Sequence, residues 1–125
     1  MIPTGIDPAP PAIHADWMDT LSRLETTITR RLAADPTGSY VAQLHARGLP
    51  VITRKLGEEA VETIVAALSG TRDDLVGESA DLLFHLAVLL AEKGIPLADV
   101  MAELDRREGV SGLEEKASRD QSGQG

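Results

Sequence analysis

The sequence predicts an all-α fold, an antiparallel bundle of about five helices in one domain. Three observations support this prediction. Apolar residues recur at steps of three and four, proline and glycine divide the chain into helix-length segments, and no alternating strand pattern is visible. Only three of the 125 residues are Phe, Trp or Tyr, so we expect a core made mainly of Leu, Ile, Val and Ala.

The first elements follow from proline content and apolar spacing. Residues 1–15 contain four prolines, which predict a flexible tail. Apolar residues then recur from Trp17 to Leu32 at the spacing of an amphipathic helix. The segment ADPTGS predicts a turn, and a short helix is expected over Tyr40–Ala46.

Proline and glycine mark the ends of the next two helices. Pro50 suits the first position of a helix over residues 50–69, and Gly70 lies just after its end. Thr71 and Asp74 have the spacing of a capping box, so the following helix is expected to start there and to end near Lys93.

The last predicted helix starts at Pro96 and stops before Gly109. It completes an all-α domain that we expect to span residues 16–110. A C-terminal segment, residues 111–125, follows and is expected to be flexible at its end.

Composition narrows the possible functions. The formal net charge is -8, which argues against a protein that binds nucleic acid by neutralising phosphates. The absence of cysteine excludes disulfides, a thiol nucleophile and cysteine-ligated zinc. No signal peptide or membrane-spanning run is visible, so we expect a cytoplasmic protein with no membrane partner.

The helix over residues 50–69 gathers its charged side chains on one face. Because an α-helix turns about 100° per residue, Lys55, Glu59 and Glu62 all lie within about 100° of Glu58. The rest of the circumference is mostly apolar, as a packed helix requires.

The next helix leaves even less of its circumference to polar side chains. Nearly everything outside a stripe about 60° wide is apolar, so we expect other helices to surround it. The stripe consists of Asp74, Glu78, Asp81 and His85.

A short turn at Gly70 predicts that these two helices are antiparallel. Glu59 and Glu62 are centred about ten residues before the turn, and Glu78 and Asp81 about nine after it, so both pairs lie roughly 15 Å from the hairpin end. Four converging carboxylates repel one another, and a divalent cation relieves that repulsion. Ligands that are all oxygen suit Mg²⁺ or Mn²⁺.

Each acidic motif also has an ordinary explanation. ExxE and ExxD occur on many solvated helix faces, and Lys55 can pair with Glu59 four residues on. His85 can pair with Asp81 or be a hydrogen-bonded core histidine; direct ligation of a metal is a third role, although imidazole is a less typical ligand of Mg²⁺. The equal distance of the two motifs from a tight turn favours metal binding over a solvated stripe.

Longer segments resemble a known family. RKLGEEAVETIVAAL and ESADLLFHLAVLLAEKGI are similar to the phosphoribosyl-ATP pyrophosphohydrolases, the second enzymes of histidine biosynthesis. GSYVAQLHARGLPVITRKLGEEAVE extends the resemblance upstream, and SGLEEKASR resembles the family's C-terminal segment. The resemblance covers the chain from about Trp17 to Arg119 and places it among the all-α nucleotide pyrophosphohydrolases related to MazG, which carry ExxE and ExxD motifs.

The resemblance implies Mg²⁺-dependent hydrolysis of phosphoribosyl-ATP to phosphoribosyl-AMP and pyrophosphate. It also implies a homodimer, which would complete a four-helix-bundle-like core and cover the apolar fourth helix. Gly77 departs from the pattern, because many relatives have a further acid there. The implied metal ligands are Glu59, Glu62, Glu78 and Asp81.

In the expected mechanism a water molecule attacks the α-phosphorus and pyrophosphate leaves. Glu58 is the candidate for orienting or deprotonating the water, and Lys55 for stabilising the phosphates, with help from Arg54 or Arg47. Two other functions fit the residues: a MazG-like housekeeping nucleoside triphosphate pyrophosphohydrolase, and a non-enzymatic helical association module whose acidic stripe is solvated.

Overall fold

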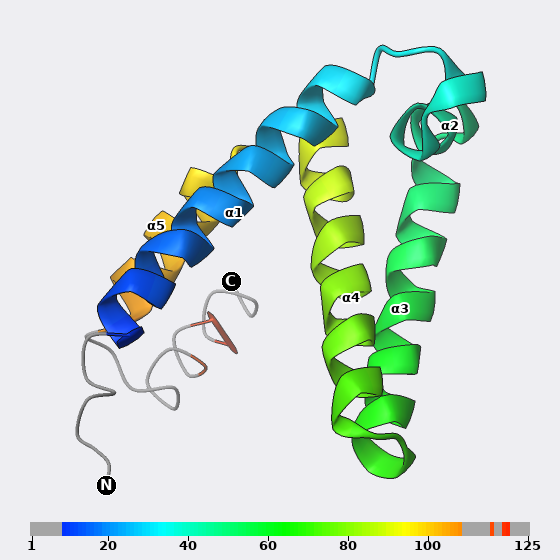
Figure 1. Cartoon of the computed structure of the whole chain (residues 1–125). Coiled ribbons are helices and arrows are strands. Elements are labelled where there is room, and N and C mark those ends of the chain that lie inside the picture. Colours follow the sequence, from blue (N-terminus) through cyan, green and yellow to red (C-terminus); the bar gives the residue numbers. More distant parts are fainter. Residues whose placement is uncertain (1–8, 109–115, 117–118, 121–125) are drawn as a thin grey trace, which may run out of the picture. The chain divides into compact units, whose positions relative to one another are not determined.

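The computed structural model describes residues 9–108, 116 and 119–120, with side chains from residue 19 onward. These residues form five α-helices, a short 3₁₀ helix and no strand, so the all-α prediction is confirmed (Figure 1). The helices are α1 (Ala9–Arg31), η2 (Pro36–Gly38), α2 (Tyr40–Arg47), α3 (Leu49–Ser69), α4 (Arg72–Glu92) and α5 (Leu97–Glu108). None of the helices in this part of the chain is both long and apolar enough to cross a bilayer.

Two compact units make up the chain, residues 1–94 and residues 95–125. The first unit contains α1 to α4, and the second contains α5. The boundary after Gly94 lies inside the domain that the sequence predicts over residues 16–110. Most of the predicted C-terminal segment, residues 111–125, lies outside the described residues.

The first helix starts earlier than its apolar pattern indicates. α1 begins at Ala9, so residues 9–15, which the sequence places in a proline-rich tail, are helical. Pro10 and Pro11 fall in the first turn, where the backbone N–H that proline lacks would have no helical partner. The remainder of the predicted tail, residues 1–8, is not described.

The hairpin formed by α3 and α4 is the framework of the first unit, and the two helices lie side by side in opposite directions (Figure 1). The capping box at the start of α4 is confirmed: the Thr71 hydroxyl accepts from the Asp74 N–H at 3.1 Å, and the Asp74 carboxylate accepts from the Thr71 N–H at 2.9 Å. A Cβ atom at Gly70 would lie only 3.0 Å from the Ala66 carbonyl oxygen, which explains why glycine occupies this turn.

The apolar core lies at the end of the hairpin away from Gly70. There the start of α3 and the end of α4 are covered by α1 and α2, and Gly48, with φ of 92°, makes the sharp connection from α2 to α3. Toward the Gly70 turn few side chains are buried, because no other described helix of this unit covers that half of the hairpin. The core cluster consists of Ile28, Val41, Leu44, Ile52, Ala87 and Val88.

Candidate active site

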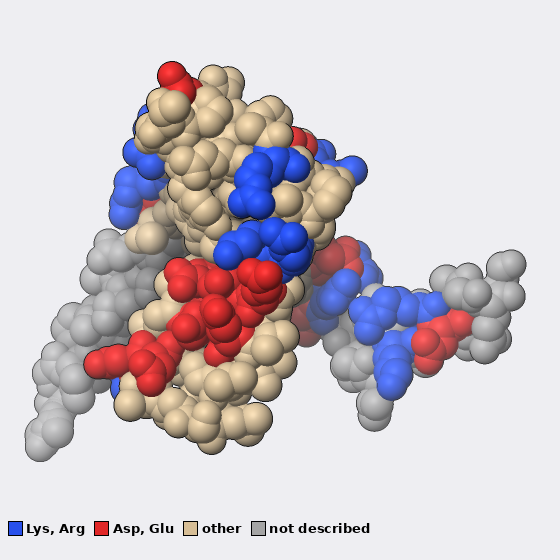
Figure 2. All heavy atoms as spheres, turned by 90° about the vertical axis from the view of Figure 1, so that its right-hand side faces the viewer, with Lys and Arg blue, Asp and Glu red and all other residues tan. Residues whose placement is uncertain are grey.

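Three of the four predicted ligand carboxylates meet between α3 and α4. Glu59, Glu78 and Asp81 each offer an oxygen atom, and these atoms all lie within 4.8 Å of one another. We call these three residues the carboxylate cluster. Figure 2 shows acidic side chains gathered in a band across this face of the molecule, with Lys and Arg side chains beside it. The hairpin therefore brings together side chains from two helices, as the spacing from the turn predicts.

Burial makes the cluster electrostatically unfavourable when it carries only negative charge. Glu59 is 8% exposed, and burial, followed by the nearby carboxyls of Glu62, Asp81 and Glu78, raises its pKa to about 7. The pKa of Glu78 is also raised, again first by burial and then by Glu62 and Asp81. Glu62 is outside the group within 4.8 Å, but its effect on both pKa values places it beside the cluster.

Two oxygen atoms of the cluster have no hydrogen-bond partner among the described residues. They are Oε2 of Glu59 and Oε1 of Glu78, and both are buried. Buried acceptors are normally satisfied, so each of these atoms requires an explanation. An all-oxygen donor set with unsatisfied acceptors fits a hard divalent cation such as Mg²⁺ or Mn²⁺.

The predicted catalytic pair lies next to the cluster but outside the group of three. Glu58 binds two cations of its own helix: its Oε1 is 3.3 Å from Lys55 Nζ, and its Oε2 is 3.7 Å from Arg54 Nε. Lys55 thus pairs with the residue three positions on, whereas the sequence suggested Glu59 at four. This contact with Glu58 is the main cause of a raised pKa at Lys55. One carboxylate and two positively charged side chains therefore lie at the edge of the site.

His85 is a hydrogen-bonded core histidine, which is one of the alternatives that the sequence leaves open. It is 6% exposed, and its Nδ1–H donates to the backbone oxygen of Asp81 at 2.8 Å. A carbonyl only accepts, so Nδ1 carries the hydrogen, and Nε2 is hydrogen-bonded to the Tyr40 hydroxyl, also at 2.8 Å. Both ring nitrogens are occupied, and the bond to Asp81 is to its backbone rather than its carboxylate.

Tyr40 joins α2 to the site, a role that the sequence does not predict. Its ring stacks on Phe84 with centroids 6.1 Å apart, and its hydroxyl bonds a residue 45 positions away. Its proximity contributes to the raised pKa of Lys55. No local pattern in the sequence relates Tyr40 to His85, because the contact depends on how α2 packs against α4.

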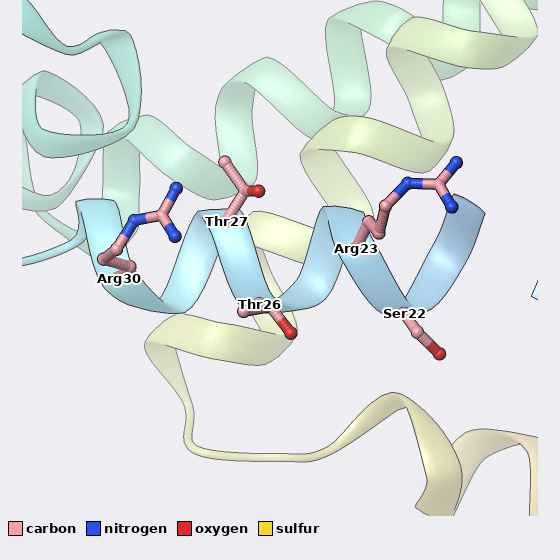
Figure 3. A pocket seen from close by; sticks show the side chains of 5 residues that line it. All are labelled: Ser22, Arg23, Thr26, Thr27 and Arg30. Atoms are coloured by element: carbon pink, nitrogen blue, oxygen red, sulfur yellow. The ribbon is translucent and has the colours of Figure 1, made fainter. Parts of the chain in front are cut away.

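Open hollows lie on the described part of the first unit, and two of them bear on the location of the site. One, of about 290 Å³, extends between α3 and α4 from the cluster to the hairpin turn, and its lining includes Glu62, Asp74 and Glu78. The other, of about 330 Å³, lies on α1 and is flanked by Arg23 and Arg30 (Figure 3). Residues of α1 line this second hollow, so it is separate from the carboxylates of the hairpin.

Fold and site together define a class: an all-α protein with an acidic, oxygen-only candidate cation site on a helical hairpin. Comparison with known proteins narrows that class. Residues 21–108 match the family described as Phosphoribosyl-ATP pyrophosphohydrolase. The chain belongs to this family, which confirms the resemblance noted in the sequence.

Curated relatives agree with the family match, and all three of the following are named phosphoribosyl-ATP pyrophosphatase. The protein from Rhizorhabdus wittichii is 67% identical over 100 residues, covering 80% of this chain and 94% of the relative. The Erythrobacter litoralis protein is 62% identical over 102 residues (82% and 98%), and the Novosphingobium aromaticivorans protein is 59% identical over 101 residues (81% and 94%). The chain is therefore an enzyme, a hydrolase, and the alternative of a non-enzymatic association module is set aside.

Proposed function

We propose that this chain hydrolyses phosphoribosyl-ATP to phosphoribosyl-AMP and pyrophosphate, the second step of histidine biosynthesis, at the carboxylate cluster. Family membership supports the reaction. The single structural observation that supports the carboxylate cluster as the site of the reaction is the pair of buried, unsatisfied oxygens on Glu59 and Glu78. No other buried side-chain nitrogen or oxygen of the described residues lacks a hydrogen-bond partner, and such atoms are typical of a site for a ligand.

The cluster and its neighbour Glu62 fit a divalent cation, with Mg²⁺ as the first choice and Mn²⁺ as the alternative. The residues proposed to hold it are Glu59, Glu62, Glu78 and Asp81, all with oxygen donors. When bound, the cation supplies positive charge that offsets the charge of the triphosphate. Carboxylates that repel one another in its absence then become favourable neighbours, and an acidic protein can accept a polyanion.

The residues beside the cluster supply the remaining chemistry. Lys55 and Arg54, now paired with Glu58, can turn to phosphate oxygens of the substrate. Glu58, released from both cations, orients the attacking water and takes its proton. The oxygen of that water bonds to the α-phosphorus, the bond from this phosphorus to the bridging oxygen breaks, and pyrophosphate leaves with the electron pair.

We further propose a homodimer in the cytoplasm. Apolar side chains on the half of the hairpin near Gly70 are exposed in a single chain, with Leu68 82% exposed. Exposed apolar side chains of this kind favour a protein partner, and a second copy would complete a four-helix arrangement. The exposed residues are Val61, Ile64, Val65 and Leu68 on α3, and Val76 and Leu83 on α4.

The decisive experiment measures pyrophosphate release from phosphoribosyl-ATP, with and without Mg²⁺, beside dUTP, dCTP and ATP. We expect Mg²⁺-dependent release from phosphoribosyl-ATP only. Release from the ordinary nucleotides instead would keep the site and assign it to a housekeeping pyrophosphohydrolase. Glu62→Gln is expected to abolish turnover without unfolding the helices, and wild-type turnover by this variant would refute the ligand assignment.

A further inference from the structure

The hydroxyl of Thr63 contacts the backbones of two cluster residues on two different helices. Thr63 lies on α3, four residues after Glu59, and is half-buried. Its Oγ1 is 2.8 Å from the carbonyl oxygen of Glu59 and 3.2 Å from the carbonyl oxygen of Glu78 on α4. A single side chain thus connects the two turns that carry the carboxylates.

The contact across to α4 is unusual for a helical hydroxyl. Threonine in a helix commonly donates to the carbonyl four residues earlier, and the contact with Glu59 is of this kind. Thr53 and Ser69, the other hydroxyl residues of α3, contact only carbonyls of their own helix. Thr63 shares its one hydrogen with a second acceptor that helix formation does not require.

Little apolar burial supports the hairpin at the position of Thr63. Along α3 the buried residues are Ile52, in the apolar core, and then Glu59 and Ala66. Large apolar side chains are therefore not buried on α3 at the level of the cluster. The carboxylate oxygens there lie within 4.8 Å of one another, so they repel when they are charged, which favours separation of α3 from α4.

We propose that Thr63 is a positioning residue: its hydroxyl ties α3 to α4 at the cluster and sets the spacing at which Glu59 and Glu78 can hold one cation. Thr63 does not itself contact substrate or cation. This inference rests on the proposed function, because the spacing between Glu59 and Glu78 matters only if these two residues hold a cation. Residues that orient metal ligands typically change affinity or activity about 10- to 100-fold when they are replaced.

The test compares three variants by Mn²⁺ binding, followed by the electron paramagnetic resonance signal of the free ion, at one fixed pH. Thr63→Val keeps the branched shape and removes the hydroxyl, so we expect Mn²⁺ affinity to fall about tenfold. Thr63→Ser keeps the hydroxyl and should bind within about twofold of the wild type. Thr53→Val removes a hydroxyl that bonds only its own helix, and should leave Mn²⁺ affinity unchanged.

A second measurement separates positioning from general stability. In metal-free Thr63→Val, amide hydrogen exchange should accelerate on both α3 and α4 near the cluster, while amides near Ile52 keep their protection. Wild-type Mn²⁺ affinity in folded Thr63→Val, or an equal loss in Thr53→Val, would overturn the inference. If Thr63→Val does not fold, the difference between Thr63→Ala and Thr63→Ser decides in the same way.

The proposed function can fail separately from this inference. If the wild-type protein binds Mn²⁺ but releases no pyrophosphate, the proposed function is refuted and the positioning role of Thr63 is not. If the wild-type protein turns over the substrate and Thr63→Val binds Mn²⁺ with unaltered affinity, the positioning role is refuted and the proposed function is not.

Discussion

Glu59 on α3 and Glu103 on α5 have the same side chain, and their surroundings displace its pKa in opposite directions. Glu103 accepts from Arg106 at 2.7 Å and from Arg107 at 2.8 Å, and these guanidinium groups lower its pKa to about 2. Glu59 is buried among carboxyl groups, and its pKa rises to about 7. Glu103 is thus paired with positively charged side chains of the chain itself, whereas Glu59 is surrounded by other carboxyl groups.

This difference teaches where to look for function. Surface glutamates with arginine neighbours occur on many helices and stabilise them a little. Clustered acids with buried, unsatisfied oxygens cost folding free energy, so their presence points to a partner that the chain itself does not provide. Lys55 and Arg54, two cations of the same helix as Glu59, are already paired with Glu58.

The largest effect is expected from removing the buried charge itself. Glu59→Gln should reduce turnover about a hundredfold or more, because the cluster loses a ligand oxygen with negative charge. The metal-free variant should unfold at an equal or higher urea concentration, since an unfavourable buried carboxylate is gone. Glu103→Gln is the matched control and should keep wild-type turnover. A loss of turnover in this variant would contradict the different roles given to Glu59 and Glu103.

Removal of divalent cations should destabilise the wild type. A ligand that binds only the folded chain stabilises it by about 2.7 kcal/mol at a concentration of 100 times its Kd. Urea unfolding with Mg²⁺ and with EDTA measures the difference, and Glu59→Gln should show much less of it. Equal midpoints for the wild type in the two buffers would contradict a cation site at the cluster.

The pH dependence of the metal-free protein should reveal the raised pKa of Glu59. A folded-state pKa of about 7, above the usual 4.5, favours the protonated carboxyl in the folded chain. The stability that this pKa shift of Glu59 contributes is therefore fully present below about pH 4.5, and it is lost as the pH rises through about 7. Urea midpoints measured across this range should fall more steeply in the wild type than in Glu59→Gln; parallel curves would contradict the shift.

Tyr40→Phe should have a moderate effect, because it removes one hydroxyl and leaves the stacking on Phe84. The lost hydrogen bond and the unpaired Nε2 of His85 should cost about 1 kcal/mol of unfolding free energy. Chemical denaturation measures this value. A midpoint equal to that of the wild type would show that the bond to His85 contributes nothing to the packing of α2.

The smallest effect is expected at Glu103. Its depressed pKa contributes stability that is present above about pH 4.5 and is lost as the pH falls through about 2. Glu103 is exposed to solvent, so the gain is strongly screened. Circular dichroism should detect only a slight loss of helix in Glu103→Gln at pH 7, and a large loss would show that α5 depends on this pair.

The sequence predicts the hairpin well because its signals are local. Pro50, Gly70 and the Thr71 cap place α3 and α4 to within a few residues, and the rise per residue brings Glu59 level with Glu78. These features depend on neighbours within a few positions along the chain.

Other parts of the site depend on packing between elements that are distant in the sequence. The Tyr40–His85 bond spans 45 residues, and the contact of Thr63 with Glu78 requires a particular rotation of α3 against α4. The choice of Glu58 as the partner of Lys55 depends on side-chain rotamers, which spacing does not fix. α1 begins at Ala9 because prolines are compatible with the first turn of a helix, which the apolar spacing alone does not indicate.

The placement of the core at one end of the hairpin gives a single chain a gradient of local unfolding. Backbone near Ile52 and Val88 opens only when the core opens, whereas backbone near Leu68 can fray at little cost. The carboxylate cluster lies between these two regions. Its local stability is therefore intermediate, high enough to keep the site formed and low enough to allow small rearrangements. An enzyme that must admit a bulky nucleotide and release two products can use such a zone, because the fluctuations it needs do not endanger the fold.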